Sequence, residues 1–197
     1  MWLGWKQVFL RPLFAGALIG LGGAIYLTIG GIVGAVAFAF GLMGVIHYGA
    51  PLYTGMAGFI NVKDKFAWIM LLITLIGNFI GCWLLSLVTP DTLTQSADAV
   101  MQSRLDAGWW TCILRGIGCG FIMTVVVQAG RDGNILPTLF GVPLFILLGF
   151  YHSIADAYYM CQSSFGFTEV WLEYLCVVVG NFIGCNAPRI LAYNDEG

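Results

Sequence analysis

The chain has 197 residues, of which 59% are apolar and only 9% are charged, and its formal net charge is −2. Soluble domains of ordinary composition contain about 25% charged residues, and a chain with a mean hydropathy of +0.88 has too little polar surface to be one. The composition excludes an ordinary soluble domain and predicts a protein of the lipid bilayer. The small negative net charge gives no sign of a nucleic-acid partner.

Apolar segments of membrane-spanning length follow one another along the chain. Residues 12–62 contain no Lys, Arg, Asp or Glu, which leaves room for two spans of about 20 residues each. The polar residues predict six spans, at about residues 13–34, 36–60, 66–88, 109–128, 135–160 and 169–189. Residues 89–106 form the only long polar connection, which we expect to be extracellular.

The basic residues set the expected orientation, because cytoplasmic loops carry an excess of Lys and Arg. With the N-terminus inside, Arg104 lies outside and six of the eight basic residues lie on the cytoplasmic side: Lys6, Arg11, Lys63, Lys65, Arg131 and Arg189. The pattern predicts a multi-pass protein of the inner or plasma membrane with both termini in the cytoplasm.

Two of the expected spans are interrupted. The second is broken at Gly49-Ala50-Pro51, because proline lacks the amide hydrogen and clashes with the preceding helical turn. The fifth is broken around His152, in the segment Gly133–Ala155, which contains no Lys, Arg, Asp or Glu. Broken helices at membrane depth are tolerated only where protein or a water-filled cavity covers the free backbone groups.

One six-residue sequence occurs twice, as Gly77–Cys82 and as Gly180–Cys185. The copies fall in the third and sixth spans, and the two interrupted spans also match, so the chain divides into halves of three spans each. Coincident helix-packing motifs are the alternative explanation. A duplicated unit with an odd number of spans inserts its second copy upside down, as in transporters built from inverted repeats. We therefore expect one membrane domain, residues 1–197, with inverted repeats at about 12–90 and 107–190.

Each break is expected to start a new half-helix near the middle of the membrane. Thr54 is a candidate cap for the first half-helix, and Ser153-Ile154-Ala155-Asp156 has the spacing of a capping box for the second. Helix N-termini carry partial positive charge and free N–H donors, which favour anions. Two such ends that meet at the midplane would form a site for a small anion or a weak acid.

His152 is the central candidate residue, since ionisable groups at membrane depth are costly and usually face a pathway or another polar group. A neutral imidazole donates a hydrogen bond, a charged one releases a proton, and burial favours the neutral form. The alternative is a core histidine that binds a backbone carbonyl, but the matching break in the other half favours a pore role. Asp156 follows one helical turn later and is interpreted as a cap or a partner of His152, with a separate proton carrier as the alternative.

The cysteines and histidines form no catalytic or metal-binding pattern. None of the six cysteines makes a Cys-x-x-Cys pair and five lie in apolar segments, so we interpret them as packing residues rather than as zinc ligands or disulfides. Ser153 adjoins His152, but neighbouring residues in a helix do not face each other. No cofactor and no metal is expected, and an enzyme is the weakest interpretation.

Several motifs resemble the formate/nitrite transporter family of anion channels, and the resemblance covers the chain from about Lys6 to Arg189. The motifs are Ala50-Pro51-Leu52-Tyr53-Thr54, Arg115-Gly116-Ile117-Gly118-Cys119, Gly149-Phe150-Tyr151-His152-Ser153-Ile154-Ala155 and the two Gly-Asn motifs. The resemblance implies an all-α integral membrane fold with six transmembrane helices, an aquaporin-like protomer and a homopentamer with one pore in each protomer.

The resemblance also assigns candidate pore residues by position. His152 matches the central pore histidine, and Thr54 matches its partner on the opposite broken helix. The other matches are the outer constriction at Phe38 and Phe145, the inner constriction at Leu42, Leu52 and Tyr53, and basic vestibule residues at Arg104 outside and Lys6 inside.

Three positions depart from the family pattern. Asp156 and Gly120 stand where the family often has Asn, and Tyr53 stands where Phe is common. The departures at Asp156 and Gly120 are expected to change the polarity near the pore and therefore to influence substrate choice.

Together these features predict a channel or transporter for small monovalent anions or their weak acids, such as formate or nitrite. Arg104 and Lys6 would concentrate anions at the two mouths, and low-dielectric constrictions would favour protonation of the anion. The neutral acid would then pass, coupled to a proton, with His152 as hydrogen-bond donor or proton source.

Two other functions are compatible with the spans. An aquaporin-like channel for neutral solutes would use paired Asn-Pro-Ala turns, but Asn78, Asn134 and Asn181 are not followed by proline. A membrane subunit without transport is the second alternative, and a histidine in a polar break argues against it.

Overall fold

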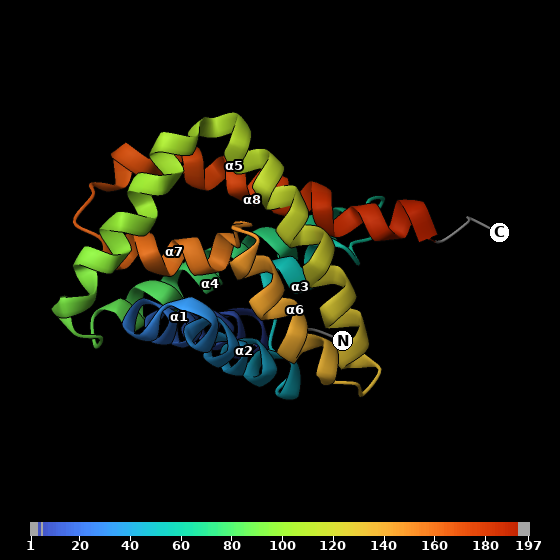
Figure 1. Ribbon diagram of the computed structural model, residues 1–197. Helices are drawn as coiled ribbons and strands as arrows, with labels where there is room; N and C mark the ends of the chain where they lie inside the picture. Colours follow the sequence, from blue (N-terminus) through green and yellow to red (C-terminus); the bar gives the residue numbers. More distant parts are fainter. Residues whose placement is uncertain (1–3, 5, 193–197) are drawn as a thin grey trace.

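The computed structural model describes residues 4 and 6–192, and the regular structure of this part is entirely helical (Figure 1). In chain order the elements are the π-helix η1 (Lys6–Leu10), α1 (Arg11–Ile29), α2 (Gly31–His47), α3 (Tyr53–Ala57), α4 (Lys65–Ser86), the 3₁₀ helix η2 (Asp91–Leu93), α5 (Thr94–Arg131), α6 (Leu136–Leu147), α7 (Ser153–Gln162) and α8 (Phe167–Ala192). The predicted all-α fold class is confirmed.

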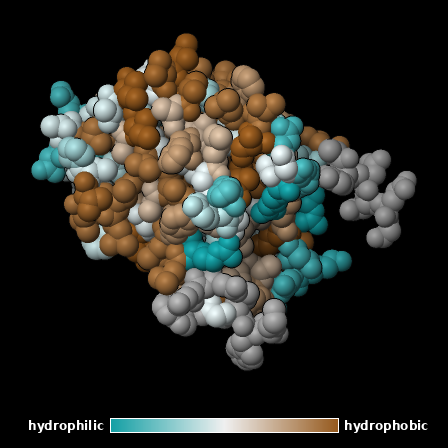
Figure 2. All heavy atoms as spheres, turned by 90° about the horizontal axis from the view of Figure 1, so that it is seen from below, coloured by the Kyte–Doolittle hydropathy of each residue, from teal (hydrophilic) through white to brown (hydrophobic). Residues whose placement is uncertain are grey.

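Among the described residues, four helical segments are long and apolar enough to cross a membrane: Val8–Ile29, Lys65–Ser86, Asp91–Arg131 and Phe167–Leu191. The second and fifth expected spans are each divided between a shorter apolar helix and a half-helix, α2 with α3 and α6 with α7. Large apolar side chains are exposed along the helices, and Figure 2 shows them over much of one face, interrupted by hydrophilic groups near its middle and on its right side. Such a surface suits contact with lipid.

Helix α1 packs along α4, and α5 packs along α8. The repeated sequence allows both contacts: a Cβ atom on Gly81 would collide with the Leu13 carbonyl, and one on Gly184 would collide with the Ile117 carbonyl. Small residues let helix backbones approach closely in a membrane. The matching contacts support the predicted repeat, whose bounds and inverted insertion stay predictions.

Helix α5 bends into an arch across the molecule (Figure 1). The helix is interrupted at Gly108, which has φ +74° and ψ 164°, a conformation that favours glycine. Most of the predicted polar connection, residues 89–106, is therefore helical and precedes the bend. Ala97 and Met101 anchor it because their side chains are buried. This segment brings Arg104 to the functional site described below.

Candidate functional site

Both predicted interruptions are present. Residues 48–52 separate α2 from α3, and residues 148–152 separate α6 from α7. Each interruption contains a glycine in the left-handed region, Gly49 with φ +55° and Gly149 with φ +67°, where a side chain would be strained. The two half-helices therefore begin after matching turns, one in each half of the chain.

Asn78 of α4 holds the first break in place through hydrogen bonds to the backbone. Its Oδ1 atom accepts a hydrogen bond from the Tyr53 amide at 2.9 Å, and its Nδ2 atom donates to the Pro51 carbonyl at 3.0 Å and to the Pro12 carbonyl at 2.8 Å. This fully buried side chain satisfies backbone groups that the broken helix leaves without intrahelical partners.

Asn181 of α8 makes the same three kinds of hydrogen bond at the second break. Its Oδ1 atom accepts from the Ser153 amide at 2.8 Å, and its Nδ2 atom donates to the Tyr151 carbonyl at 2.8 Å and to the Gly116 carbonyl at 2.9 Å. The repeated motif is visible in the sequence, but this role of its asparagine was not predicted from it. The signal was available, because a buried asparagine in a lipid-embedded helix requires polar partners.

The cysteines that end the two repeated sequences connect the halves. The thiol of Cys82 donates to the Ile154 carbonyl of α7 at 3.3 Å, and the thiol of Cys185 donates to the Thr54 carbonyl of α3 at 3.3 Å. Each cysteine thus contacts the half-helix of the other half. All six cysteines are free thiols, and four of them, Cys82, Cys112, Cys119 and Cys185, are buried.

The predicted cap of α3 is wrong. The N-cap residue is Leu52, which makes no side-chain cap bond, and the Tyr53 amide is satisfied by Asn78 instead. Thr54 is the second residue of the helix, two positions after the N-cap, and its hydroxyl lies beside His152.

The predicted capping box of α7 is also wrong. The N-cap residue is His152, whose Nδ1 atom accepts a hydrogen bond from the Ala155 amide at 3.1 Å. Ser153 is the first residue inside the helix, and its hydroxyl has no hydrogen-bond partner among the described residues. The carboxylate of Asp156 binds Arg104 rather than the helix end.

The centre of the site joins the two half-helices. The Nε2 atom of His152 lies 3.1 Å from the Oγ1 atom of Thr54, and both side chains are buried. Since the Ala155 amide can only donate, Nδ1 of His152 must accept, and the neutral ring therefore carries its proton on Nε2. In this tautomer His152 donates to Thr54, whose own hydroxyl proton is left to bind another acceptor.

Two phenylalanines adjoin this centre. The Phe145 ring stacks on the His152 ring, with centroids 5.7 Å apart and an interplanar angle of 25°. The Phe38 ring meets the Phe145 ring edge to face at 6.2 Å. The residues of the predicted outer constriction therefore lie together beside the histidine.

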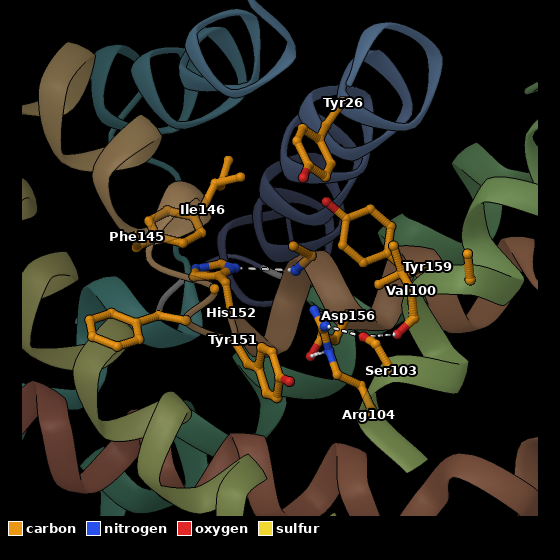
Figure 3. A pocket seen from close by; sticks show the side chains of 14 residues that line it. Tyr26, Val100, Ser103, Arg104, Phe145, Ile146, Tyr151, His152, Asp156 and Tyr159 are labelled. Atoms are coloured by element: carbon orange, nitrogen blue, oxygen red, sulfur yellow. Dashed lines mark hydrogen bonds and ion pairs between the residues drawn. The ribbon is translucent and has the colours of Figure 1, made fainter. Parts of the chain in front are cut away.

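A cavity of about 280 Å³ opens on this side of the histidine, and we call it the outer cavity after the predicted orientation. Figure 3 shows Phe145 and His152 on one side of it and the Arg104–Asp156 pair on the other, with the Tyr151 ring beside Arg104. Arg104 Nη2 lies 2.8 Å from Asp156 Oδ1 and Arg104 Nε lies 3.2 Å from Asp156 Oδ2. The predicted vestibule cation and the unusual acid at Asp156 are thus partners in one ion pair.

A second cavity of about 220 Å³ lies at the other break, and we call it the inner cavity. It is lined by Leu52 of the predicted inner constriction and by Arg131, whose Nη2 atom donates to the Gly55 carbonyl at 2.7 Å. Leu42 and Tyr53 are buried nearby but are not among its lining residues, and the Tyr53 hydroxyl donates to the Val178 carbonyl at 3.1 Å.

Two basic residues concern the inner side: Lys6, which the resemblance assigns there, and Arg131, which lines the inner cavity. Lys6 begins η1, but its side chain lies outside the described part of the chain. Arg131 was counted among the cytoplasmic basic residues in the sequence, yet its approach to the break depends on the path of α5 and could not be read from its position.

The departure at Gly120 concerns helix packing. A Cβ atom on Gly120 would collide with the Asn181 carbonyl of α8, so this position faces the neighbouring helix and lines neither cavity. The expectation that Gly120 changes the polarity of the pore is therefore not supported by its position, whereas Asp156 does line the outer cavity.

Similar proteins are found by sequence. The chain is 27% identical over 177 residues to the uncharacterized transporter YrhG of Bacillus subtilis (strain 168), with 80% of this chain and 66% of that protein covered. It is 25% identical over 234 residues to a protein named as a probable formate transporter of Methanothermobacter thermautotrophicus, with 90% of this chain and 84% of that protein covered.

Solved structures share the fold. One described as an FNT family ion channel superposes with a TM-score of 0.80 at 22% identity, covering 91% of this chain and 85% of the other. One described as a pentameric formate channel with formate bound gives a TM-score of 0.78 at 18% identity, covering 92% and 93%. The sequence model of the formate/nitrite transporter family matches residues 1–193. The chain therefore belongs to the formate/nitrite transporter family, whose members are transporters and channels rather than enzymes.

Proposed function

We propose that the protein is a channel that passes small monovalent anions in the form of their weak acids, with formate and nitrite as the first candidates. The family membership, a relative named as a probable formate transporter and the fold of a formate channel support this proposal. We further propose a homopentamer in the inner or plasma membrane, with both termini in the cytoplasm and two inverted repeats.

The observation that carries the proposal is the contact between His152 Nε2 and Thr54 Oγ1, 3.1 Å apart, where the two broken helices meet. The cap bond from the Ala155 amide to Nδ1 supports a neutral imidazole that donates from Nε2. A second proton would have to sit on Nδ1, opposite an amide that also donates, and the cap would be lost. The geometry favours the donor role over the proton-source role: the permeating acid carries its own proton, and Thr54 and His152 supply a hydrogen bond to it.

The magnitudes favour passage of the neutral acid. An ion of carboxylate size that leaves water for a medium of low dielectric loses of order 20 kcal/mol in the idealised limit. One charge-assisted hydrogen bond returns only about 1.5–3 kcal/mol. Protonation of an acid with a pKa near 4 costs about 4 kcal/mol at pH 7. Between Phe38, Phe145 and Leu52 the neutral form is therefore far less costly than the bare anion.

The purified protein in liposomes tests this function. We expect formate and nitrite uptake above that of empty liposomes, faster at pH 5.5 than at pH 7.5 by roughly the ratio of neutral acid concentrations. Chloride, which has no neutral form in this range, should pass far more slowly. Equal chloride and formate flux without pH dependence would refute the proposal, and glycerol uptake would point to a neutral-solute channel.

A further inference from the structure

The Arg104–Asp156 pair is built into the wall of the outer cavity by two different helices. Arg104 belongs to the first part of α5 and Asp156 to the first turns of α7, and only 14% of the arginine side chain and 3% of the aspartate side chain are exposed. Both residues line the outer cavity together with His152 (Figure 3). The pair lies one helical turn from the histidine, since Asp156 is at i+4 from His152 in the same segment.

The guanidinium of Arg104 is occupied along its edge and on its face. Nη2 and Nε bind the two carboxylate oxygens of Asp156, and Nη1 donates to Ser103 Oγ at 3.0 Å. The carbon atom of the guanidinium lies 3.7 Å from the centroid of the Tyr151 ring. The two-point edge is the part of an arginine that binds carboxylates and similar anions best, and here Asp156 holds it.

Asp156 is held firmly in this place. Its backbone amide donates to the His152 carbonyl at 2.9 Å within the first turn of α7, and its charge lies near the positive end of that helix. To bind this edge of Arg104, a permeating anion would have to displace the carboxylate of Asp156. That carboxylate is buried and, as part of α7, cannot diffuse away. The pair carries no net charge, so the outer cavity gains no anion attraction from Arg104 at a distance.

We propose that Asp156 is a selectivity residue that keeps Arg104 from binding anions, so that the outer cavity admits the uncharged weak acid to His152 and holds its anion poorly. This inference rests on the proposed function. Asp156 acts on permeation indirectly, by occupying Arg104. Competition between anions distinguishes this role from a merely structural one.

The test uses formate uptake into right-side-out membrane vesicles, with nitrate in the external bath as an anion that has no neutral form. In the unaltered protein we expect uptake to rise linearly with external formate and to resist external nitrate. In Asp156→Asn the freed guanidinium should bind both anions. Uptake should then saturate, and nitrate should inhibit at a concentration at least about tenfold lower, which corresponds to about 1.4 kcal/mol.

Two control variants define the cause. Asp106→Asn removes a carboxylate from the same helix, exposed and bound to Gln102 Nε2 at 2.8 Å, and should leave nitrate inhibition as in the unaltered protein. Arg104→Gln with Asp156→Asn removes both members of the pair and should abolish the inhibition that Asp156→Asn creates. Nitrate inhibition in the double variant would overturn the assignment to Arg104.

The remaining outcomes also decide. If external nitrate inhibits the unaltered protein as strongly as Asp156→Asn, the proposal is wrong. If Asp156→Asn does not assemble, the nitrate response of the unaltered protein and of the double variant still decides it. If no variant carries formate, the proposed function fails, and calorimetric titration of purified protein with nitrate then tests the pair alone: tight binding to the unaltered protein contradicts it, and binding only to Asp156→Asn supports it.

Discussion

The two breaks of the chain share one scaffold and differ in the residue placed at its end. Asn78 and Asn181 hold them with the same three kinds of hydrogen bond, and Gly49 and Gly149 turn the chain with the same sign of φ. The residue before the half-helix is Leu52 in one and His152 in the other. The features that the two breaks share fix the geometry, and the residue in which they differ gives each break its own chemistry.

The two cavities differ in the same way. Each has an arginine from α5, but Arg104 of the outer cavity is neutralised by Asp156, whereas in the described part of the chain no carboxylate forms an ion pair with Arg131 of the inner cavity. The arginine that lines the outer cavity is therefore neutralised, whereas the one that lines the inner cavity keeps its positive charge. The difference implies that anions are held more strongly at the inner mouth than at the outer one.

The largest expected effect comes from removing the shared scaffold. Asn78→Ala and Asn181→Ala each leave buried backbone groups without partners, at about 1–3 kcal/mol for each group. We expect each variant to lose about 3–5 kcal/mol of stability, and thermal unfolding in detergent should occur about 10 °C lower. Asn134→Ala is the control, because Asn134 accepts only one exposed bond, from the Leu136 amide at 3.2 Å.

The comparison of the two breaks predicts that the two asparagine variants are similarly unstable. A variant at one break that unfolds like the unaltered protein, beside a strongly destabilised variant at the other, would show that the matching bonds do not have matching weight. The supposed common scaffold would then be limited to one half of the chain.

The next effect concerns the chemistry at the centre. Thr54→Val keeps the shape of the side chain but leaves the Nε2 proton of His152 without its acceptor, which costs about 1–3 kcal/mol. If permeation uses this pair, formate uptake should fall about 10- to 100-fold, while Thr54→Ser should retain most of it. Thr74→Val is the matched control, since in the described part of the chain the buried Thr74 hydroxyl hydrogen-bonds only to the sulfur of Met56. Equal uptake by the Val and Ser variants of Thr54 would remove this hydroxyl from the mechanism.

Much of this architecture could be predicted from the sequence because it depends on local features. Gly49-Ala50-Pro51 cannot continue a helix, and the repeated Gly-Asn motif indicated that the break around His152 has a counterpart. The proximity of His152, Thr54, Phe38 and Phe145 followed from the family resemblance, and the structure brings these side chains together.

The missed features depend on contacts between distant segments. The polar residues of 89–106 suggested a connection, but helix α5 carries Arg104 to Asp156, and only the three-dimensional path reveals that pair. The S-x-x-D pattern suggested a capping box. The hydrogen bond from the Ser153 amide to Asn181 instead starts the helix at Ser153, so that His152 is the N-cap residue. Local patterns identify candidate caps, and the register set by a neighbouring helix decides among them.

The smallest expected effect sharpens the comparison of the two mouths. Arg131→Gln removes the charge of the inner cavity, worth about 1 kcal/mol towards an anion at a few ångströms in a wet cavity. In inside-out vesicles, nitrate should therefore inhibit formate uptake by the unaltered protein, and the variant should need about fivefold more nitrate. The effect should shrink at high ionic strength, because exposed charges are screened.

A second arginine provides the control for Arg131. Arg189 also donates to a backbone carbonyl, that of Ile60 at 2.8 Å, and it lines neither the outer nor the inner cavity. Arg189→Gln should therefore leave nitrate inhibition unchanged, although it removes the same charge and a similar bond. Equal responses of the two arginine variants would mean that nitrate inhibition depends on the total positive charge on the inner side of the protein. The difference between the two mouths would then no longer depend on which arginine has a carboxylate partner.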